Sequence, residues 1–253
     1  MKKYGLIGYP LTHSFSKKYY DSKFERERIT DVDYQLYSIE TIAEFTRMIS
    51  ENPQLMGVNV TIPYKIAVMD YVQKLSPEAE AIAAVNCIKI DRSGPAPVLT
   101  GYNTDVYGFM TSLKPLLRPW HTAALVLGNG GAAKAVLYAL TQLGIETSLV
   151  SRAPMAGQFH YGQLDRLVLD KYLLIVNTTP LGTYPDIHTC PEIPYDLLGK
   201  RHLLYDLVYN PETTAFLKQG AERGAVVKNG LEMLELQAER NWEIWNGTER
   251  QIK

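Results

Sequence analysis

The sequence contains only two cysteines, Cys87 and Cys190, among its 253 residues. Two thiols are too few for a disulfide framework, and their separation matches no common spacing of metal ligands. We therefore expect neither a disulfide-stabilised fold nor a metal site. Each cysteine is interpreted as a small apolar side chain of the core.

Net charge and long apolar runs are also lacking. The formal net charge is −1, so no global basic field attracts nucleic acid or an acidic membrane surface. No stretch approaches the roughly 20 apolar residues of a membrane-spanning helix. The opening stretch MKKYGLIGYP reaches Pro10 too early for a signal peptide. These absences favour a cytoplasmic protein that acts on small molecules rather than on nucleic acid or membranes.

The remaining composition is that of a globular protein of one large or two modest domains. Short apolar runs alternate with amphipathic stretches, which predicts crossover units on a largely parallel sheet and hence an α/β fold. Strands are expected at residues 4–8, 33–39, 56–62, 85–90, 123–127, 146–150, 172–176, 203–207 and 225–227. Helices are expected at residues 17–27, 41–50, 63–75, from 76, 105–117, 131–143, 212–223 and 231–245. Residues 153–167 have a weak period and are expected to form a poorly defined helix or loop.

The stretch NVTIPYK, residues 59–65, places three polar groups close together in sequence. Asn59 and Thr61 alternate with apolar residues, so they are predicted to share one face at a strand end. Pro63 suits the first position of a helix, which would place Lys65 in its first turn. The segment is therefore predicted to direct an amide, a hydroxyl and an ammonium toward one place. Asn86, in the apolar stretch AVNCIKI, also needs polar partners if it is buried.

A glycine-rich turn follows the strand predicted at 123–127. Gly128, Gly130 and Ala133 fit the dinucleotide-binding pattern, in which glycines let the backbone approach a pyrophosphate at a helix N-terminus. The next strand ends at Ser151-Arg152, where NAD-binding proteins usually hold an acid for the ribose 2′-hydroxyl. An arginine there suits a 2′-phosphate.

Some of these polar residues also have a plain structural interpretation. GYNTDVYGF places Asn103 to Asp105 at a helix start, where such residues cap helices and complement the dipole. Ser16 can likewise cap the helix predicted after it. The residue pattern leaves capping and chemistry open for both segments.

The sequence resembles the shikimate dehydrogenase family along essentially its whole length. The segments that carry the resemblance are, in order, GYPLTHSFS, GVNVTIPYK, AVNCI, GYNTDVYGF, GNGGAAKA, NTTPLG, DLVYNPETT and NGLEMLELQA. The resemblance implies reversible NADPH-dependent reduction of 3-dehydroshikimate by two α/β domains separated by a cleft. We expect a substrate-binding and catalytic domain at 1–104 with a largely parallel sheet, and a Rossmann-type NADP-binding domain at 105–230. The helix at 231–253 is expected to return to the first domain, and the assembly is expected to be a monomer or a homodimer.

The resemblance also assigns roles to individual residues. Lys65 and Asp105 match the catalytic pair. Substrate-binding positions are matched by Ser14 and Ser16 for the carboxylate, by Thr61, Asn86 and Gln237 for ring hydroxyls, and by Tyr209. Cofactor-binding positions are matched by Gly128, Asn129, Gly130, Gly131, Ala132, Ser151, Arg152 and Thr178, and near the nicotinamide by Gly230 and Met233.

The sequence departs from the family at two places. Lys17, Tyr20 and Asp21 replace the residues that usually follow the HSFS segment, and Lys17 adds a charge near the expected carboxylate site. The arginine turn reads Ser-Arg-Ala-Pro-Met-Ala and lacks the second basic residue that the family usually carries there. Alternatives are a quinate or quinate/shikimate dehydrogenase using NAD, a non-catalytic ligand sensor on the same fold, and a plain nucleotide-binding module. A sensor is disfavoured because Lys65 and Asp105 are both present.

Overall fold

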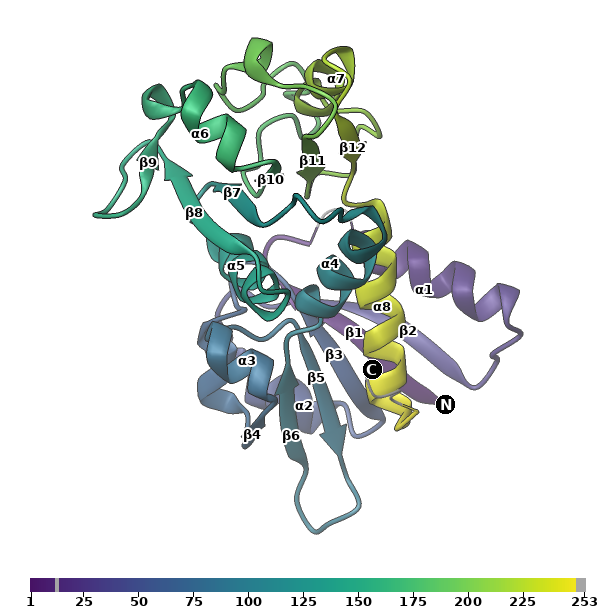
Figure 1. The fold of residues 1–253 in the computed structure, drawn as a ribbon. Coiled ribbons are helices and arrows are strands. Elements are labelled where there is room, and N and C mark those ends of the chain that lie inside the picture. The colour runs from purple at the N-terminus through teal and green to yellow at the C-terminus, as the bar shows by residue number, and fades with distance from the viewer. Residues whose placement is uncertain (12–13, 249–253) are drawn as a thin grey trace. The chain divides into compact units, whose positions relative to one another are not determined.

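The structure is a computed structural model that describes residues 1–11 and 14–248. The chain divides into two compact units (Figure 1). The first unit comprises Met1–Asp105 and Gln237–Lys253, and the second comprises Val106–Leu236. Among the described residues, no helix combines the length and the apolar character that crossing a membrane requires.

The first unit is built on a six-stranded mixed sheet in the order β2-β1-β3-β5-β6-β4. Its strands are β1 (Lys2–Gly8), β2 (Val32–Ser38), β3 (Leu55–Val60), β4 (Lys74–Leu75), β5 (Cys87–Asp91) and β6 (Val98–Tyr102). β1 pairs in parallel with β2 and β3, and β4 with β6, whereas β5 is antiparallel to both its neighbours. The carboxyl ends of β1 and β3 therefore share one edge of the sheet.

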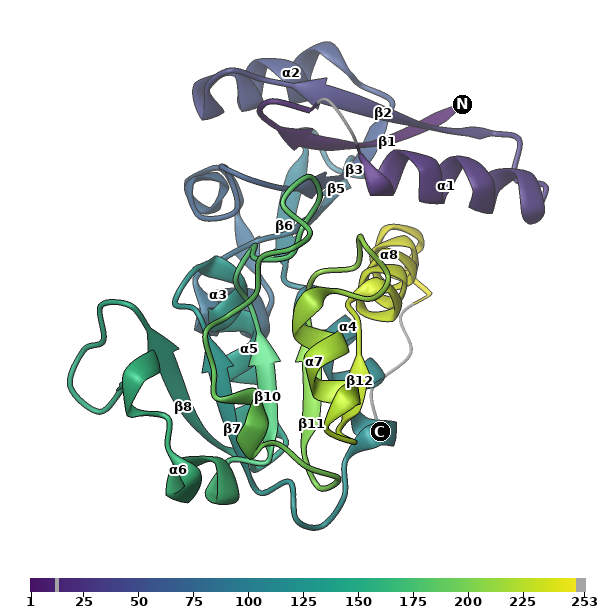
Figure 2. The same ribbon diagram turned by 90° about the horizontal axis from the view of Figure 1, so that it is seen from above.

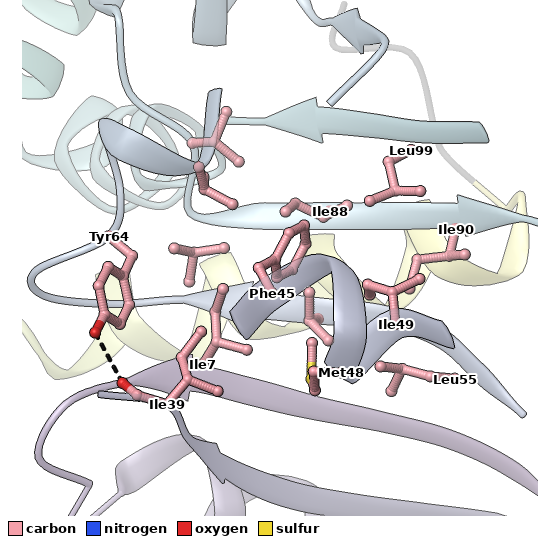
Figure 3. Packing of buried hydrophobic residues seen from close by; sticks show 14 of the residues in the cluster. Ile7, Ile39, Phe45, Met48, Ile49, Leu55, Tyr64, Ile88, Ile90 and Leu99 are labelled. Carbon is pink, nitrogen blue, oxygen red and sulfur yellow. Dashed lines mark hydrogen bonds between the residues drawn. The ribbon is translucent and has the colours of Figure 1, made fainter. Parts of the chain in front are cut away.

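Helices cover both faces of this sheet. They are α1 (Phe15–Arg26), the 3₁₀ turns η1 (Ile42–Glu44) and η2 (Ala67–Tyr71), α2 (Phe45–Glu51), α3 (Pro77–Ile82) and the later part of α8 (Leu231–Asn246). One core cluster joins α2 and α3 to the sheet, and Tyr64 extends it by donating a hydrogen bond to the carbonyl oxygen of Ile39 at 2.7 Å (Figure 3). A second cluster joins α1 and α8 to the other face. Because neighbouring residues of β1, Leu6 and Ile7, belong to different clusters, this strand is buried on both sides.

The end of α8 is fixed to the first sheet by Trp245. Its indole nitrogen donates to the carbonyl oxygen of Ile88 at 3.0 Å, and its ring stacks on Tyr4. A Cβ built on Gly57 would lie 2.3 Å from the indole ring, so only glycine leaves room for it at this place on β3. Tyr20 of α1 also donates to the carbonyl oxygen of Ala238 at 2.8 Å, which ties α1 to α8.

The second unit contains a six-stranded sheet in which every pair of neighbours is parallel. Its strands are β7 (Ala123–Leu127), β8 (Glu146–Ser151), β9 (Phe159–His160), β10 (Leu174–Asn177), β11 (Leu203–Asp206) and β12 (Val226–Lys228). The order β12-β11-β10-β7-β8-β9 is that of a Rossmann fold, in which ligands bind at the carboxyl edge beside the first strand (Figure 2). The predicted α/β class with a Rossmann-type unit is confirmed.

The helices of the second unit connect these strands. They are α4 (Asp105–Leu113), η3 (Lys114–Leu116), α5 (Gly131–Gln142), η4 (Tyr161–Gln163), α6 (Arg166–Lys171), η5 (Tyr195–Leu197), α7 (Ala215–Glu222) and the start of α8. Residues 153–167, predicted as a poorly defined helix or loop, contain β9, η4 and the start of α6. A two-residue strand and a single 3₁₀ turn are too short to produce a sequence period, which explains the weak signal.

The prediction of a helix at 63–75 is wrong. The range contains the 3₁₀ turn η2 and the short strand β4 instead, and Lys65 lies before that turn. The carbonyl oxygen of Lys65 accepts from the backbone N–H of Val85 at 2.8 Å, so it is taken by a distant segment instead of by Met69. The N–H of Met69 bonds to Ile66 instead.

Candidate active site

Lys65, Asp105 and Asn86 form one hydrogen-bonded group in the first unit. The ammonium of Lys65 donates to Oδ2 of Asp105 at 2.7 Å, and the side-chain amide of Asn86 donates to Oδ1 at 2.8 Å. Both carboxylate oxygens therefore have a fixed partner. The Lys65 side chain remains 35% exposed and that of Asp105 20% exposed, so a small molecule can still reach both.

The surrounding backbone fixes the three side chains. Asn86 precedes β5, and its N–H donates to the carbonyl oxygen of Tyr102 at the end of β6, at 3.0 Å. Asp105 is the first residue of α4, three positions after β6 ends. Two antiparallel strands thus bring the amide and the carboxylate together although 19 positions separate them. The sequence interpretation placed Asn86 within a strand, whereas it lies in the bend before β5.

A further chain of hydrogen bonds joins this group to α8. Oδ1 of Asn86 accepts from the backbone N–H of Thr104 at 2.8 Å and lies 3.1 Å from its hydroxyl. That hydroxyl also lies 2.6 Å from Oδ1 of Asn241, whose amide donates to Oε1 of Gln237 at 3.0 Å. Gln237, predicted as a substrate residue, is thereby linked to the Lys65–Asp105 pair. Asn241 was not predicted, although its position one helical turn after Gln237 was a usable signal.

The two predicted carboxylate ligands occupy different environments. Ser14 is the N-cap of α1, and its hydroxyl accepts from the N–H of Lys17 at 3.2 Å. Ser16 lies inside the helix and partly offsets the rise that burial causes in the pKa of Tyr34, which is well above its usual value. Capping by Ser16, which the sequence left open, does not occur, because Ser14 is the N-cap. His13, between the predicted strand and these serines, lies outside the described residues.

The residues that depart from the family at this point have structural partners. Lys17 pairs with Asp21 one turn later at 2.6 Å, so its added charge is matched locally. Tyr20 is fully buried and bonded to α8.

Only part of the NVTIPYK segment behaves as predicted. Thr61 is half-buried at the end of β3, next to Gly8, where a Cβ would lie 2.5 Å from the threonine methyl. Asn59 is buried instead, and its Oδ1 accepts from Tyr34 at 2.8 Å. Its amide nitrogen lies 3.5 Å from the carbonyl oxygen of Asn86, so the polar atoms of Asn59 have partners within the fold.

The predicted cofactor residues gather at the carboxyl edge of the second sheet. Each follows a parallel strand, so the ends of β7, β8, β10, β11 and β12 bring them to one edge. They are Gly128 to Ala132 after β7, Ser151 and Arg152 at the end of β8, Thr178 after β10, and Gly230 and Met233 after β12. Tyr209, predicted to bind the substrate, follows β11 at the same edge.

The glycine turn has the geometry that a bound pyrophosphate requires. Gly128 has φ +100°, and a Cβ there would lie 3.0 Å from the Thr178 hydroxyl. Gly130 is the N-cap of α5, and a Cβ on Gly130 or Gly131 would meet nothing within 4 Å. Open space therefore lies in front of a helix N-terminus, whose N–H groups and dipole favour phosphate. The residues present fit a dinucleotide.

The backbone is closely packed at the part of the carboxyl edge that follows β12. A Cβ on Gly230 would overlap the carbonyl oxygen of Leu207. Any residue larger than glycine is therefore excluded at this position, just before α8. Met233, in the first turn of α8, is partly exposed, as is Tyr209, whose pKa burial raises.

A buried carboxylate that the sequence did not reveal supports this edge. Asp206 is fully buried and accepts from the hydroxyl of Thr214 at 2.6 Å, from the amide of Asn177 at 2.9 Å and from the N–H of Val208 at 3.0 Å. Burial raises the pKa of Asp206 to about 6. Asn177 in turn accepts from the hydroxyl and N–H of Thr179, which packs against Gly128. Within the described residues, no three His, Cys, Asp or Glu side chains form a metal-binding group.

Comparison with known proteins places this arrangement in a family. The family described as shikimate dehydrogenase substrate binding domain matches residues 6–88. The shikimate dehydrogenase (NADP(+)) of Clostridium beijerinckii is 40% identical over 258 residues, covering 97% of this chain and 92% of that protein. A crystal structure of shikimate 5-dehydrogenase from Thermus thermophilus with NADP(H) and shikimate has a TM-score of 0.84 at 30% identity, covering 98% of this chain and 94% of that one. The Listeria monocytogenes enzyme, solved with shikimate and NAD, has a TM-score of 0.86 at 27% identity, covering 98% and 93%.

The fold and the comparisons define a two-unit oxidoreductase, with a Lys65–Asp105 ion pair in one unit and a glycine-capped helix N-terminus at the sheet edge of the other. The chain belongs to the shikimate dehydrogenase family.

Proposed function

We propose that this protein catalyses the reversible, NADP-dependent oxidation of shikimate to 3-dehydroshikimate. The observation that carries the proposal is the Lys65–Asp105–Asn86 group, which places an ammonium and a carboxylate 2.7 Å apart in a partly exposed position. The Clostridium beijerinckii relative and the Thermus thermophilus structure support the same substrate and cofactor.

The acid–base chemistry falls to Lys65. When bound, NADP supplies the acceptor for the hydride that leaves the carbinol carbon of shikimate. The hydroxyl on that carbon must lose its proton at the same stage. Lys65 takes up this proton in oxidation as the neutral amine, and in reduction the ammonium so formed returns it. Asp105 holds the lysine side chain in place and accepts a hydrogen bond from a substrate hydroxyl. In reduction the ammonium also stabilises the negative charge that develops on the ketone oxygen.

The remaining substrate contacts are assigned by chemistry. Ser14 and Ser16, near the start of α1, bind the carboxylate through their hydroxyls. Thr61, Asn86 and Gln237 bind ring hydroxyls, and the network through Thr104 and Asn241 fixes the orientation of both amides. Tyr209 contributes to the substrate site, and the units serve as substrate-binding and NADP-binding domains.

The cofactor preference rests on Arg152. Its guanidinium is exposed and makes no ion pair with any acidic group in the described part of the chain. A 2′-phosphate can therefore take both arms of the guanidinium, whereas a 2′-hydroxyl cannot. Gly128 to Ala132 hold the pyrophosphate, and Thr178, Gly230 and Met233 complete the cofactor site.

The function is tested by following cofactor absorbance with shikimate and with quinate, each paired with NADP and with NAD. We expect the highest kcat/KM for shikimate with NADP. A higher kcat/KM for quinate, or for NAD, would show that the alternative substrate or cofactor is the native one. We also propose a cytoplasmic enzyme that acts as a monomer or homodimer, which light scattering at assay concentrations tests.

A further inference from the structure

The short strand β9 lies directly beside the Ser151-Arg152 turn (Figure 1). It pairs in parallel with β8, with Val150 opposite Phe159 and Ser151 opposite His160. Directly opposed residues of neighbouring strands lie about 5 Å apart. His160 is therefore the strand neighbour of the residue that precedes Arg152.

The pleat places His160 away from the core. Val150 is fully buried in the core cluster of this unit, and Phe159 packs against the same cluster. Because successive residues of a strand point to opposite faces, Ser151 and His160 both face away from that cluster. Ser151 is buried there, whereas His160 is exposed at the sheet edge.

The turn after β9 holds the histidine ring in one orientation. Nδ1 of His160 accepts from the N–H of Gly162 at 3.1 Å, and the N–H of His160 donates to Oε1 of Gln163 at 2.7 Å. Since Nδ1 accepts, the proton of the neutral ring sits on Nε2, which becomes the donor. Nε2 has no hydrogen-bond partner among residues 1–11 and 14–248.

The charge of Arg152 acts on the same turn. Burial raises the pKa of Tyr161, the residue after His160, and the positive charge of Arg152 partly offsets that rise. Residues 153–158 contain no charged side chain, so the next side chain after Arg152 that can carry positive charge is His160.

We propose that His160 is a second specificity residue for NADP, donating from Nε2 to the 2′-phosphate that Arg152 binds. The inference rests on the proposed function. A planar guanidinium binds two phosphate oxygens and leaves the third open to a further donor. His160 supplies that donor from the neighbouring strand, in place of the second basic residue that the arginine turn lacks.

The test measures binding of two probes by calorimetry, adenosine 2′,5′-bisphosphate and adenosine 5′-monophosphate, at fixed pH and ionic strength. The variant is His160→Asn, because the asparagine Oδ1 can still accept from Gly162 while Nε2 is removed. We expect about 10-fold weaker binding of the bisphosphate and unchanged binding of the monophosphate, as for loss of one hydrogen bond to a charged group.

Arg152→Ala serves as the reference, and we expect it to weaken the bisphosphate at least as much. Arg201→Gln is the matched control for net charge, because Arg201 lies before β11 at the opposite edge of the sheet. It should change neither affinity by more than about two-fold, as a distant exposed charge is screened. For shikimate oxidation, the ratio of kcat/KM with NADP to kcat/KM with NAD should also fall in Arg152→Ala and in His160→Asn, and stay unchanged in Arg201→Gln.

Three results would overturn the role of His160. Unchanged bisphosphate binding in His160→Asn, alongside a clear loss in Arg152→Ala, would leave the proposed function standing and remove His160 from it. Equal weakening of both probes would show that the variant disturbs the turn rather than the phosphate contact. A wild-type protein that binds the two probes equally would refute the 2′-phosphate site itself, and activity with NAD would then show whether the dehydrogenase function survives.

Discussion

At the scale of single residues, the proposed acid–base chemistry depends on two side chains, those of Lys65 and Asp105. Lys65 and Asp105 each have a fixed partner, so we expect them to act as a unit. Lys65→Ala should lower kcat for shikimate by about 10²–10⁴-fold, the usual contribution of a positioned acid–base group. The double variant with Asp105→Ala should lose much less than the product of the two single losses.

Steady-state kinetics on all three variants measures this. Lys74→Ala is the control, because Lys74 is an exposed lysine of the same unit on β4. A folded Lys65→Ala protein with nearly wild-type kcat would remove Lys65 from the reaction.

Ser14 combines its position as the N-cap of α1 with a proposed substrate contact, and an alanine substitution cannot separate the two. As the N-cap of α1, it should cost about 1 kcal/mol of stability when changed to alanine. As a ligand of the substrate carboxylate, it should raise the KM for shikimate. Ser14→Gly separates the roles, because glycine is a tolerated N-cap but has no hydroxyl.

We therefore expect Ser14→Gly to raise the KM for shikimate about 10- to 100-fold, leave the KM for NADP unchanged and hardly alter the melting temperature. Ser76 caps α3 with the same geometry, its hydroxyl accepting from Ala79 at 3.2 Å. Ser76→Ala should thus lower the melting temperature without changing KM. An unchanged shikimate KM in Ser14→Gly would show that the carboxylate binds elsewhere.

At the scale of elements, α8 and β3 require each other. Gly57→Ala should destabilise the protein by about 1–3 kcal/mol, since its Cβ would overlap the Trp245 indole and force the end of α8 to shift. Trp245→Phe should be destabilising too, through loss of volume and of the bond to Ile88.

Denaturant unfolding of both single variants and the double variant measures the coupling. The smaller ring should accommodate the added methyl, so the double variant should lose less stability than the two single variants together. Strict additivity would show that Gly57 and Trp245 do not constrain each other.

The elements that the sequence predicted well are those with strong periodicity and clear ends. β7 was predicted to the residue, and α5, α7 and α8 to within three residues at each end. The segment around Lys65 was misjudged because Pro63 suits a helix start, whereas the carbonyl of Lys65 is bound by Val85 from a distant segment. Such tertiary hydrogen bonds leave no local trace in the sequence.

The residues of the site likewise divide into those that the sequence marked and those that it did not. Lys65, Asp105 and the glycine turn lie in short dense motifs, and for this reason the sequence alone marks them as candidate site residues. Asn241 and Asp206 were missed because each contacts its partners only after folding.

At the scale of the whole molecule, stability should respond to pH through buried groups with opposite effects. Burial lowers the pKa of His121 and of His202, each of which accepts from a backbone N–H through Nδ1. Their folded state favours the neutral ring, so the stability they contribute is complete above about pH 6.5 and is lost as the pH falls below it.

Asp206 has the opposite effect. Its pKa is raised from 3.8 to about 6, so the folded state binds the proton more tightly than the unfolded state does. Its ionisation therefore costs stability as the pH rises through 6, and the folded protein regains that stability as the pH falls from 6 to 4. A shift of this size in a fully buried group corresponds to roughly 3 kcal/mol.

The prediction is that wild-type protein and Asp206→Asn differ in the slope of stability against pH. Between pH 7 and 4, the free energy of unfolding of the wild type should rise relative to that of Asp206→Asn by roughly 3 kcal/mol. Exposed carboxylates such as Glu146 titrate equally in both proteins, so the difference between the two curves isolates Asp206. Urea unfolding at half-unit pH steps provides the curves. Two parallel curves would mean that the donors from Thr214, Asn177 and Val208 keep Asp206 ionised throughout, and that its hydrogen bonds outweigh its burial.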